Sequence, residues 1–277
     1  MQAYVQRLVS LPKEMWTSRR LIWKLSKNDF KTRYAGSYLG IIWAFIQPVV
    51  TILMYWLVFE KGIGSATQGL KSGITVPFLL YLTSGLVPWF FFSEAVSNST
   101  NALLEYNYLV KKVVFQISIL PVIKIIAAGF IHVFFILVLL LMCTLYGYYP
   151  GVYTLQVLYY SLCLFALVLA MSYTLSAVVI FFRDLSQIVN IGLQIGMWAT
   201  PIMWNFAKAE GHPVVSFIFK LNPVFYVVNG YRQALFEKTW FWQDAALTAY
   251  FWIFTIILYM IGVHIFERLR PHFADVL

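Results

Sequence analysis

Few residues of this chain have the type and spacing that nucleotide hydrolysis, metal binding or proton transfer requires. The sequence contains no GxxxxGK(S/T) phosphate loop, so we do not expect it to hydrolyse ATP by the usual route. Cys143 and Cys163 lie in apolar runs without metal-ligand spacing, and we predict that they are packing residues and that the chain binds no metal. Glu94 and His132 also lie in apolar runs, where an ionisable group indicates either a proton relay or a buried polar group with a local hydrogen-bond partner.

Residues 98–121 hold a group of polar residues between two apolar runs. Ser99, Thr100 and Asn101 are typical helix N-caps. Glu105 follows in the first turns, where the helix dipole favours an anion, and a lysine pair lies at the other end. The stretch therefore predicts a short capped helix. Four apolar residues recur along it at helical spacing: Leu103, Tyr106, Val110 and Val113. This apolar side indicates either a docked partner protein or a helix resting on lipid.

The elements that position these residues must lie in a membrane. Of the 277 residues, 61% are hydrophobic and 11% are charged, and the mean hydropathy is +0.76. A helix that crosses a bilayer needs about 20 apolar residues. Six runs are suitable: Leu39–Phe59, Pro77–Val96, Val122–Tyr146, Tyr153–Phe182, Ile188–Trp204 and Ala245–Phe266. Six crossings place both termini on the same side.

The distribution of basic residues orients these crossings. Fourteen of the 20 Lys and Arg lie on the side of the termini, and six lie on the other side. Because basic loops stay in the cytoplasm, both termini are predicted to be cytoplasmic. No cleavable signal is visible, since residues 1–38 are polar and basic. We interpret the net charge of +9 as a signal for topology and lipid headgroups, and we do not expect nucleic acid as a partner.

Residues Leu11–Lys31 carry cations on one helical stripe and apolar residues opposite. The cations are Lys13, Arg20, Lys24, Lys27 and Lys31, and the apolar residues are Leu11, Met15, Ile22 and Leu25. Trp16 and Trp23 flank the boundary, where indole rings favour the headgroup zone. The pattern predicts an amphipathic helix that lies on the membrane with its basic face toward anionic lipid. A solvated basic tail is the alternative.

The stretch 201–244 is apolar but interrupted. The interruptions are Pro201, Pro213, Lys220, Pro223 and Arg232. Neither piece is long enough to cross comfortably, and backbone at membrane depth must be hydrogen-bonded internally or line a cavity. We predict two short helices that lie on the outer face or dip into it. An eight-span arrangement is the alternative.

Four blocks of the sequence resemble the permease subunits of type-2 ATP-binding-cassette exporters for polysaccharides. The first block, NDFKTRYAGSYLGIIWAFIQPVV, has the family's conserved types at Arg33, Tyr34, Ser37, Leu39, Gly40, Trp43 and Pro48. The others are SGLVPWFFFSEAVSNSTNALLEYNYLVKKVVF, FFRDLSQIVNIGLQIGMWATPIMW and LNPVFYVVNGYRQALF, so the match runs from about residue 26 to 266. Teichoic-acid export permeases are most similar, with O-antigen and capsule permeases next. Many relatives have Pro where Gln116 stands here.

The resemblance implies an all-α integral membrane fold with six transmembrane helices. Residues 1–38 would form a cytoplasmic tail with the interfacial helix, 39–266 the permease domain, and 267–277 a cytoplasmic tail. Two short extracellular or re-entrant helices would lie within 201–244, between spans five and six. The resemblance further implies a homodimer that works with two copies of an ATP-binding-cassette ATPase subunit. ATP and Mg²⁺ would bind to that partner, and this chain would bind no cofactor.

The resemblance also assigns roles to three sets of residues. The coupling segment, seated in a cleft of the ATPase, would use Asn101, Leu103, Leu104, Glu105, Tyr106, Leu109, Lys111 and Lys112. The interface helix would use Lys13, Trp16, Arg20, Trp23, Lys24 and Lys27. The cytoplasmic mouth would contain Arg33, Tyr34, Glu94, Arg183 and Asp184. We expect Arg183 and Asp184 to hold the turn between the fourth and fifth spans by contacts with Arg33 or Glu94. A simple turn with snorkelling charges is the alternative.

Aromatic residues make up 19% of the chain and suit a conduit for a sugar polymer, because ring faces pack against the apolar faces of sugars. The conduit candidates are Trp43, Phe45, Tyr55, Trp56, Tyr81, Trp89 and Phe90. Ordinary interfacial or lipid-facing positions are the alternative. Helix breaks on the exit side are expected at Thr200, Pro201, Asn222 and Pro223.

From these features we expect a permease in the bacterial cytoplasmic membrane that exports an undecaprenyl-diphosphate-linked polysaccharide, with wall teichoic acid first. Membrane lipid and the glycopolymer would be its other partners. The alternatives are an O-antigen, capsule, drug or lipid exporter of the same superfamily, and an ion-coupled secondary carrier.

Overall fold

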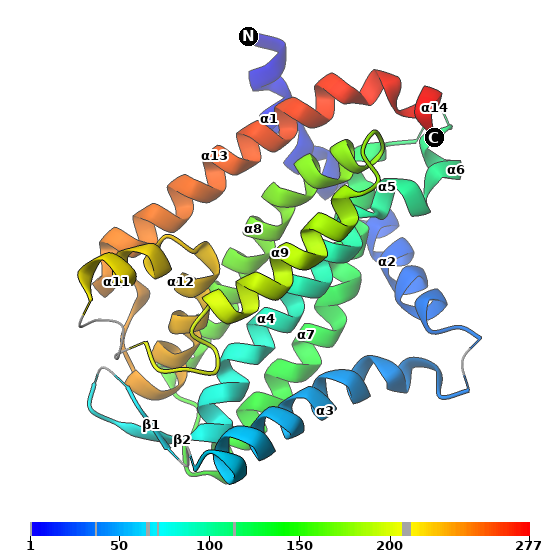
Figure 1. Cartoon of the computed structure of the whole chain (residues 1–277). Helices are drawn as coiled ribbons and strands as arrows, with labels where there is room; N and C mark the ends of the chain where they lie inside the picture. The colour runs from blue at the N-terminus through cyan, green and yellow to red at the C-terminus, as the bar shows by residue number, and fades with distance from the viewer. Residues whose placement is uncertain (1, 37, 65–66, 71, 113–114, 207–211) are drawn as a thin grey trace.

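The computed structural model describes residues 2–36, 38–64, 67–70, 72–112, 115–206 and 212–277. Ser37 of the first family block and Val113 of the predicted apolar side lie outside these ranges. Figure 1 shows a bundle of long helices with both chain termini at one end, which we call the termini end. The short helices α5 (Ala102–Glu105), α6 (Asn107–Val110) and α14 (Phe273–Val276) lie at this end.

Five segments of the described chain are long and apolar enough to cross a membrane. They are Gly40–Gly62, Phe78–Thr100, Ile117–Leu145, Val152–Val179 and Phe241–Val276. The helices within them are α3 (Trp43–Trp56), α4 (Phe78–Thr100), α7 (Leu120–Leu145), α8 (Gln156–Val179) and α13 (Ala245–Leu269). The prediction of a helical, multi-pass membrane protein is therefore confirmed.

The fifth predicted span, Ile188–Trp204, is shorter in the structure. Its helix, α9 (Leu185–Ala199), has 15 residues. At 1.5 Å per residue it is roughly 22 Å long, against a hydrocarbon core of about 30 Å. It ends at Ala199 because the next residue, Thr200, precedes a proline, and a residue before proline disfavours helical backbone. Thr200 accordingly adopts an extended backbone with φ −94° and ψ 133°. α9 is therefore too short to cross the hydrocarbon as one straight helix.

The core is built around α4. This helix packs against α3, α7, α8, α9 and α12 (Pro223–Arg232). It has buried residues on all sides, as expected for a helix without an amphipathic stripe. α13 packs along α8, where Gly262 allows a close approach. A Cβ at Gly262 would lie 2.8 Å from the carbonyl oxygen of Ala170, so a larger residue would push these helices apart.

The N-terminal segment is two helices rather than one. α1 (Gln2–Thr17) and α2 (Arg19–Arg33) meet at Ser18, whose hydroxyl donates to Gln116 Oε1 at 2.7 Å and does not cap α2. The prediction of one continuous helix over Leu11–Lys31 is therefore wrong. The two sides are as the pattern predicts, because Leu11 and Ile22 are buried and all five cations of the stripe are exposed. α2 packs against α7.

Residues 101–112 also form two short helices, α5 and α6, rather than one. α4 continues through Ser99 and Thr100, whose hydroxyls donate to the Val96 carbonyl at 3.2 and 2.7 Å. Because these side chains bond back into α4, Ser99 and Thr100 do not cap the next helix. Asn101 stands at the α5 N-cap position without a side-chain cap bond, and the chain breaks again at Tyr106 with φ −98° and ψ 30°.

The remaining elements connect the spans. β1 (Thr67–Gly69) and β2 (Thr75–Pro77) pair antiparallel, with Gln68 opposite Val76, and the sequence did not predict this hairpin. α11 (Pro213–Lys220) and α12 lie where two short helices were predicted. α12 packs into the bundle against α4 and α8. Gly230 permits this contact, since a Cβ there would come within 2.1 Å of the Tyr160 ring.

Candidate functional site

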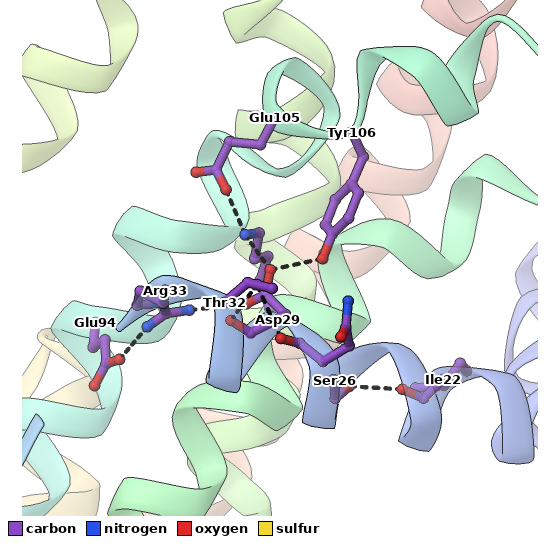
Figure 2. Close-up of polar contacts among 10 residues, drawn as sticks. Ile22, Ser26, Asp29, Thr32, Arg33, Glu94, Glu105 and Tyr106 are labelled. Carbon is purple, nitrogen blue, oxygen red and sulfur yellow. Dashed lines mark hydrogen bonds and ion pairs between the residues drawn. The ribbon is translucent and has the colours of Figure 1, made fainter. Parts of the chain in front are cut away.

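Asp29 is the centre of a polar cluster at the side of the bundle (Figure 2). Its side chain is 6% exposed and accepts hydrogen bonds from three neighbours. Lys124 Nζ lies 2.5 Å and the Tyr106 hydroxyl 2.7 Å from Oδ1, and Arg33 Nη2 lies 3.1 Å from Oδ2. A buried carboxylate is expensive unless it is paired and hydrogen-bonded, and here both of its oxygens are used.

Two further carboxylates extend the cluster. Lys124 also bonds Glu105 Oε2 at 2.5 Å, and Arg33 Nη1 bonds Glu94 Oε1 at 2.5 Å. We call Asp29, Arg33, Glu94, Glu105, Tyr106 and Lys124 the Asp29 cluster. It contains three carboxylates and two cations, so most of its charge is balanced within the chain.

Each element contributes its residue for a local reason. Asp29 and Arg33 lie four residues apart on α2 and therefore on the same face. Lys124 lies in the first turns of α7, which begins with Pro121 at a position where no backbone donor is needed. Tyr106 lies in the break between α5 and α6, and this break directs its phenol toward Asp29. The cluster thus joins α2, α4, α7 and the segment 101–112.

The charges in the cluster support one another. Burial alone lowers the pKa of Arg33, but Glu94 and Asp29 raise it by more, so the guanidinium stays charged. Burial raises the pKa of Tyr106, and its hydrogen bond to Asp29 raises it further. Tyr106 therefore remains a neutral phenol whose hydroxyl donates a hydrogen bond to Asp29.

A second set of contacts ties the segment 101–112 to α9. The Ser186 hydroxyl donates to Asn101 Oδ1 at 2.7 Å, and the Ser97 hydroxyl donates to Asn190 Oδ1 at 3.0 Å. Asn101 is further held by its Nδ2, which donates to the Ser97 carbonyl at 3.1 Å. The segment is therefore held on one side by α2 and α7 and on the other by α9.

The turn before α9 is not pinned as the sequence suggested. Arg183 and Asp184 are exposed, and in the described part of the chain neither forms an ion pair. Arg33 and Glu94 bond one another instead (Figure 2). The pinning hypothesis is corrected: the α9 contacts to Asn101 and Ser97 hold this turn.

The predicted coupling residues fall into two groups. Leu103 is fully buried within the chain, while Asn101, Leu104, Tyr106 and Leu109 are partly buried. Glu105, Lys111 and Lys112 are exposed, together with Tyr108, whose exposed fraction is 56%. Part of the predicted apolar side is therefore already covered by this chain. The surface left for a partner includes Glu105, Asn107, Tyr108, Lys111 and Lys112.

The predicted interface residues lie on the outside of α1 and α2. Lys13, Trp16, Arg20, Trp23, Lys24 and Lys27 are all exposed. Lys27 Nζ lies 5.5 Å from the centre of the Trp23 ring, a cation–π contact. Tyr34 is half-buried beside Arg33, and its ring packs against Phe30.

The seven conduit candidates do not share one cavity in the described structure. Tyr81 and Trp89 are buried in the core, and Phe45 and Phe90 pack against Phe135. The other three are Trp43, which is exposed, and Tyr55 and Trp56, which are partly buried. Trp89 alone of the seven lines the apolar cavity of about 520 Å³ between α4, α8, α9, α12 and α13.

The exit-side candidates are joined by a residue to which the sequence assigned no role. Asn222 Nδ2 donates to Thr200 Oγ1 at 2.8 Å, and Asn222 Oδ1 caps α12 just before Pro223. Arg232 is 3% exposed, and it donates to the carbonyls of Pro201 and Ile202 at 2.7 and 3.0 Å. Its guanidinium also lies 3.6 Å from the Tyr81 ring centre. The sequence feature that could have indicated this role is an arginine within an apolar stretch.

His132 has hydrogen-bond partners at one of its ring nitrogens, while its Nδ1 is buried without a partner among the described residues. Its Nε2 lies 3.2 Å from both the Ser161 and the Tyr231 hydroxyl oxygens, and its ring stacks on Phe91. No role was assigned to Asp29 from the sequence, and its pairing with Lys124 was not predicted. Asp29 lies among cations on α2, and its i,i+4 spacing to Arg33 was the one local signal.

Comparison with known proteins gives a consistent result. The family model described as ABC-2 type transporter matches residues 20–236. An O-antigen export system permease protein RfbA of Myxococcus xanthus is 27% identical over 269 residues, which cover 97% of this chain and 99% of the relative. Two proteins of the same name from Klebsiella pneumoniae are 26% and 24% identical, each covering 91% of this chain and 93% of the relative.

Proposed function

The chain belongs to the ABC-2 type transporter family, and on that premise we propose that it is the permease subunit of an ATP-driven exporter of a lipid-linked polysaccharide. Three relatives named as O-antigen export permeases support a polymer of the O-antigen type. Wall teichoic acid, the first expectation from the sequence, is the second candidate. The lipid carrier is proposed to be undecaprenyl diphosphate.

The observation that carries this proposal is the Asp29 cluster. A separate ATPase subunit can move the spans only if the contact that it makes is connected to them. The segment 101–112 presents Tyr108, Lys111 and Lys112 outward and is bonded inward to α2, α4 and α7 through Asp29, Arg33 and Lys124. We propose that this segment rests on the ATPase and that the cluster passes its movement to the spans.

The proposed assembly contains two copies of this chain and two copies of the ATPase. ATP and Mg²⁺ would bind to the ATPase subunits. The second permease copy is proposed to pack against α3 and α9, which, like α7, α8 and α13, leave large apolar side chains uncovered. These include Leu53 and Met54 of α3 and Ile191 and Ile195 of α9. Both termini are proposed to be cytoplasmic, on the side of the ATPase, at the bacterial plasma membrane.

Docking can be tested with Tyr108→Asp combined with Lys112→Glu. Both side chains are exposed, so the permease should fold and insert as before. Tyr108→Asp removes an aromatic contact and Lys112→Glu reverses a charge at the interface. Together they should lower retention of the ATPase on purification about tenfold. Co-purification and stimulated ATP hydrolysis measure the effect. The control is Lys61→Glu, an exposed lysine at the far end of α3. Full retention in the double variant would refute the docking surface.

An ion-coupled carrier remains the rival function, and the buried His132 with Ser161 and Tyr231 is the observation that favours it. Purified permease in proteoliposomes separates the two functions. The proposed exporter should move lipid-linked polysaccharide only with its ATPase and ATP. Transport by the permease alone under a proton gradient would favour the carrier.

A further inference from the structure

A cavity lies beside α1 and α2, and it shares no lining residue with the Asp29 cluster. Its volume is about 450 Å³, and it is lined by residues of α1, α2, α7, α8 and α13. From its shape and charge we infer that it binds one anionic phospholipid of the surrounding bilayer, with an acyl chain inside and the phosphate at Arg19. This inference does not depend on which polymer is exported.

The interior of the cavity suits a hydrocarbon chain. Ile22 and Val122 are buried at its base, and Ile126, Phe165 and Leu169 continue the apolar lining along α7 and α8. Phe165 lies 14 residues before the end of α8 at Val179, a distance of roughly 21 Å along the helix. The apolar lining on α8, Phe165 and Leu169, therefore lies well inside that helix, at a level that suits an acyl chain rather than a headgroup.

The mouth of the cavity carries a positioned cation between two indoles. Arg19 Nη1 donates to the Trp16 carbonyl at 3.0 Å, and its guanidinium lies 5.0 Å from the centre of the Trp16 ring. These contacts fix one side of the guanidinium. In the described part of the chain Arg19 has no carboxylate partner, so its other donors face outward. Trp16 and Trp23 are 71% and 51% exposed, as expected for indoles at a headgroup layer.

The two N-terminal helices line the cavity together. Pro12, Met15 and Trp16 of α1 and Arg19, Ile22 and Trp23 of α2 all contribute to its lining. These positions recur three to four residues apart, so they form one face of the segment on either side of Ser18. Residues of α7, α8 and α13 supply the rest of the lining.

The charge at the mouth distinguishes between kinds of lipid. Arg19 is the one cation that lines the cavity, which matches the single charge of a phosphodiester such as phosphatidylglycerol. A diphosphate carrier would require more cations at the mouth. The headgroup of a zwitterionic lipid carries a cation of its own, which would repel the guanidinium. Such a lipid would therefore bind less tightly. We therefore assign the cavity to an anionic phospholipid.

The test uses native mass spectrometry of the purified full-length chain with added phosphatidylglycerol or phosphatidylcholine of identical acyl chains. Phosphatidylglycerol should be retained preferentially by the unmodified protein. Arg19→Gln should lower this retention about tenfold, as expected for loss of a charge-assisted bond. Lys24→Gln is the matched control, because Lys24 is an exposed cation of α2 that does not line the cavity. It should lower retention less than twofold.

A second variant tests the interior. Ile126→Trp fills the cavity without changing any charge, and it should also lower phosphatidylglycerol retention about tenfold, through lost chain burial. Equal losses in Arg19→Gln and Lys24→Gln would mean that general surface charge binds the lipid, and the assignment would fall. Equal retention of both lipids, or displacement of phosphatidylglycerol by an equimolar polyprenyl diphosphate, would also overturn it.

Discussion

At the residue scale, Asp29 and Arg232 have the most to lose from substitution. Each is a buried charged side chain whose partners come from other elements: Asp29 from α7 and the segment 101–112, and Arg232 from the carbonyls that follow α9. Removing one member of such a group leaves its partners buried without compensation, which costs more than the bond itself contributes.

Asp29→Asn should lower the free energy of unfolding by about 3 kcal/mol, because Lys124 stays buried with only the half-exposed Glu105 as a carboxylate partner. Chemical unfolding in detergent measures the change. Adding Lys124→Met should restore most of the lost free energy of unfolding, because the buried cation that lacks compensation is then removed. Asp275→Asn, at an exposed carboxylate near the C-terminus, is the control. A single variant no less stable than this control would contradict the role of Asp29.

Arg232→Met should lower the free energy of unfolding by about 2 to 4 kcal/mol, because the carbonyls of Pro201 and Ile202 each lose a charged donor. Lys238→Met, at an exposed cation six residues later, should change it by less than about 0.5 kcal/mol. Comparison of the two unfolding curves tests this. Equal midpoints would show that Arg232 does not hold the end of α9.

At the element scale, apolar run length predicted the long helices well but did not predict the early end of α9 or the breaks at Ser18 and Tyr106. α4, α7, α8 and α13 follow the predicted runs closely. α9 ends early because proline at 201 follows it, and the breaks at Ser18 and Tyr106 coincide with bonds to Gln116 and Asp29. Such long-range bonds have no period in the sequence. The family blocks located the segment 101–112, but not its link to α2.

Tyr106→Phe tests that link directly. The variant removes only the hydroxyl that donates to Asp29, so the outward surface of the segment stays intact. ATPase should still co-purify, while polymer export per ATP hydrolysed should fall about fivefold, as loss of a bond to a charged group suggests. Tyr108→Phe is the matched control on an exposed tyrosine two residues away. If both variants export equally, the cluster does not transmit movement.

At the scale of the whole molecule, the chain combines a helical bundle with one outward-facing contact segment at the termini end (Figure 1). The bundle buries one imidazole, that of His132, beside the hydroxyls of Ser161 and Tyr231. Its polar groups bond helices to one another, at the Asp29 cluster, between Ser97 and Asn190, and around Arg232. This organisation suits a body moved by another subunit, and the proposed ATPase supplies the energy.

The central claim is that an ATPase grips the segment 101–112 during turnover, and photo-crosslinking tests it most directly. A photoreactive amino acid is placed at Tyr108, and at Tyr149 as a control. Tyr149 is 77% exposed in the loop between α7 and α8, beside the β hairpin at the other end of the bundle. With ATP and polymer present, illumination should attach the ATPase at Tyr108 and not at Tyr149. No ATPase at Tyr108, or equal yields at both positions, would contradict the claim.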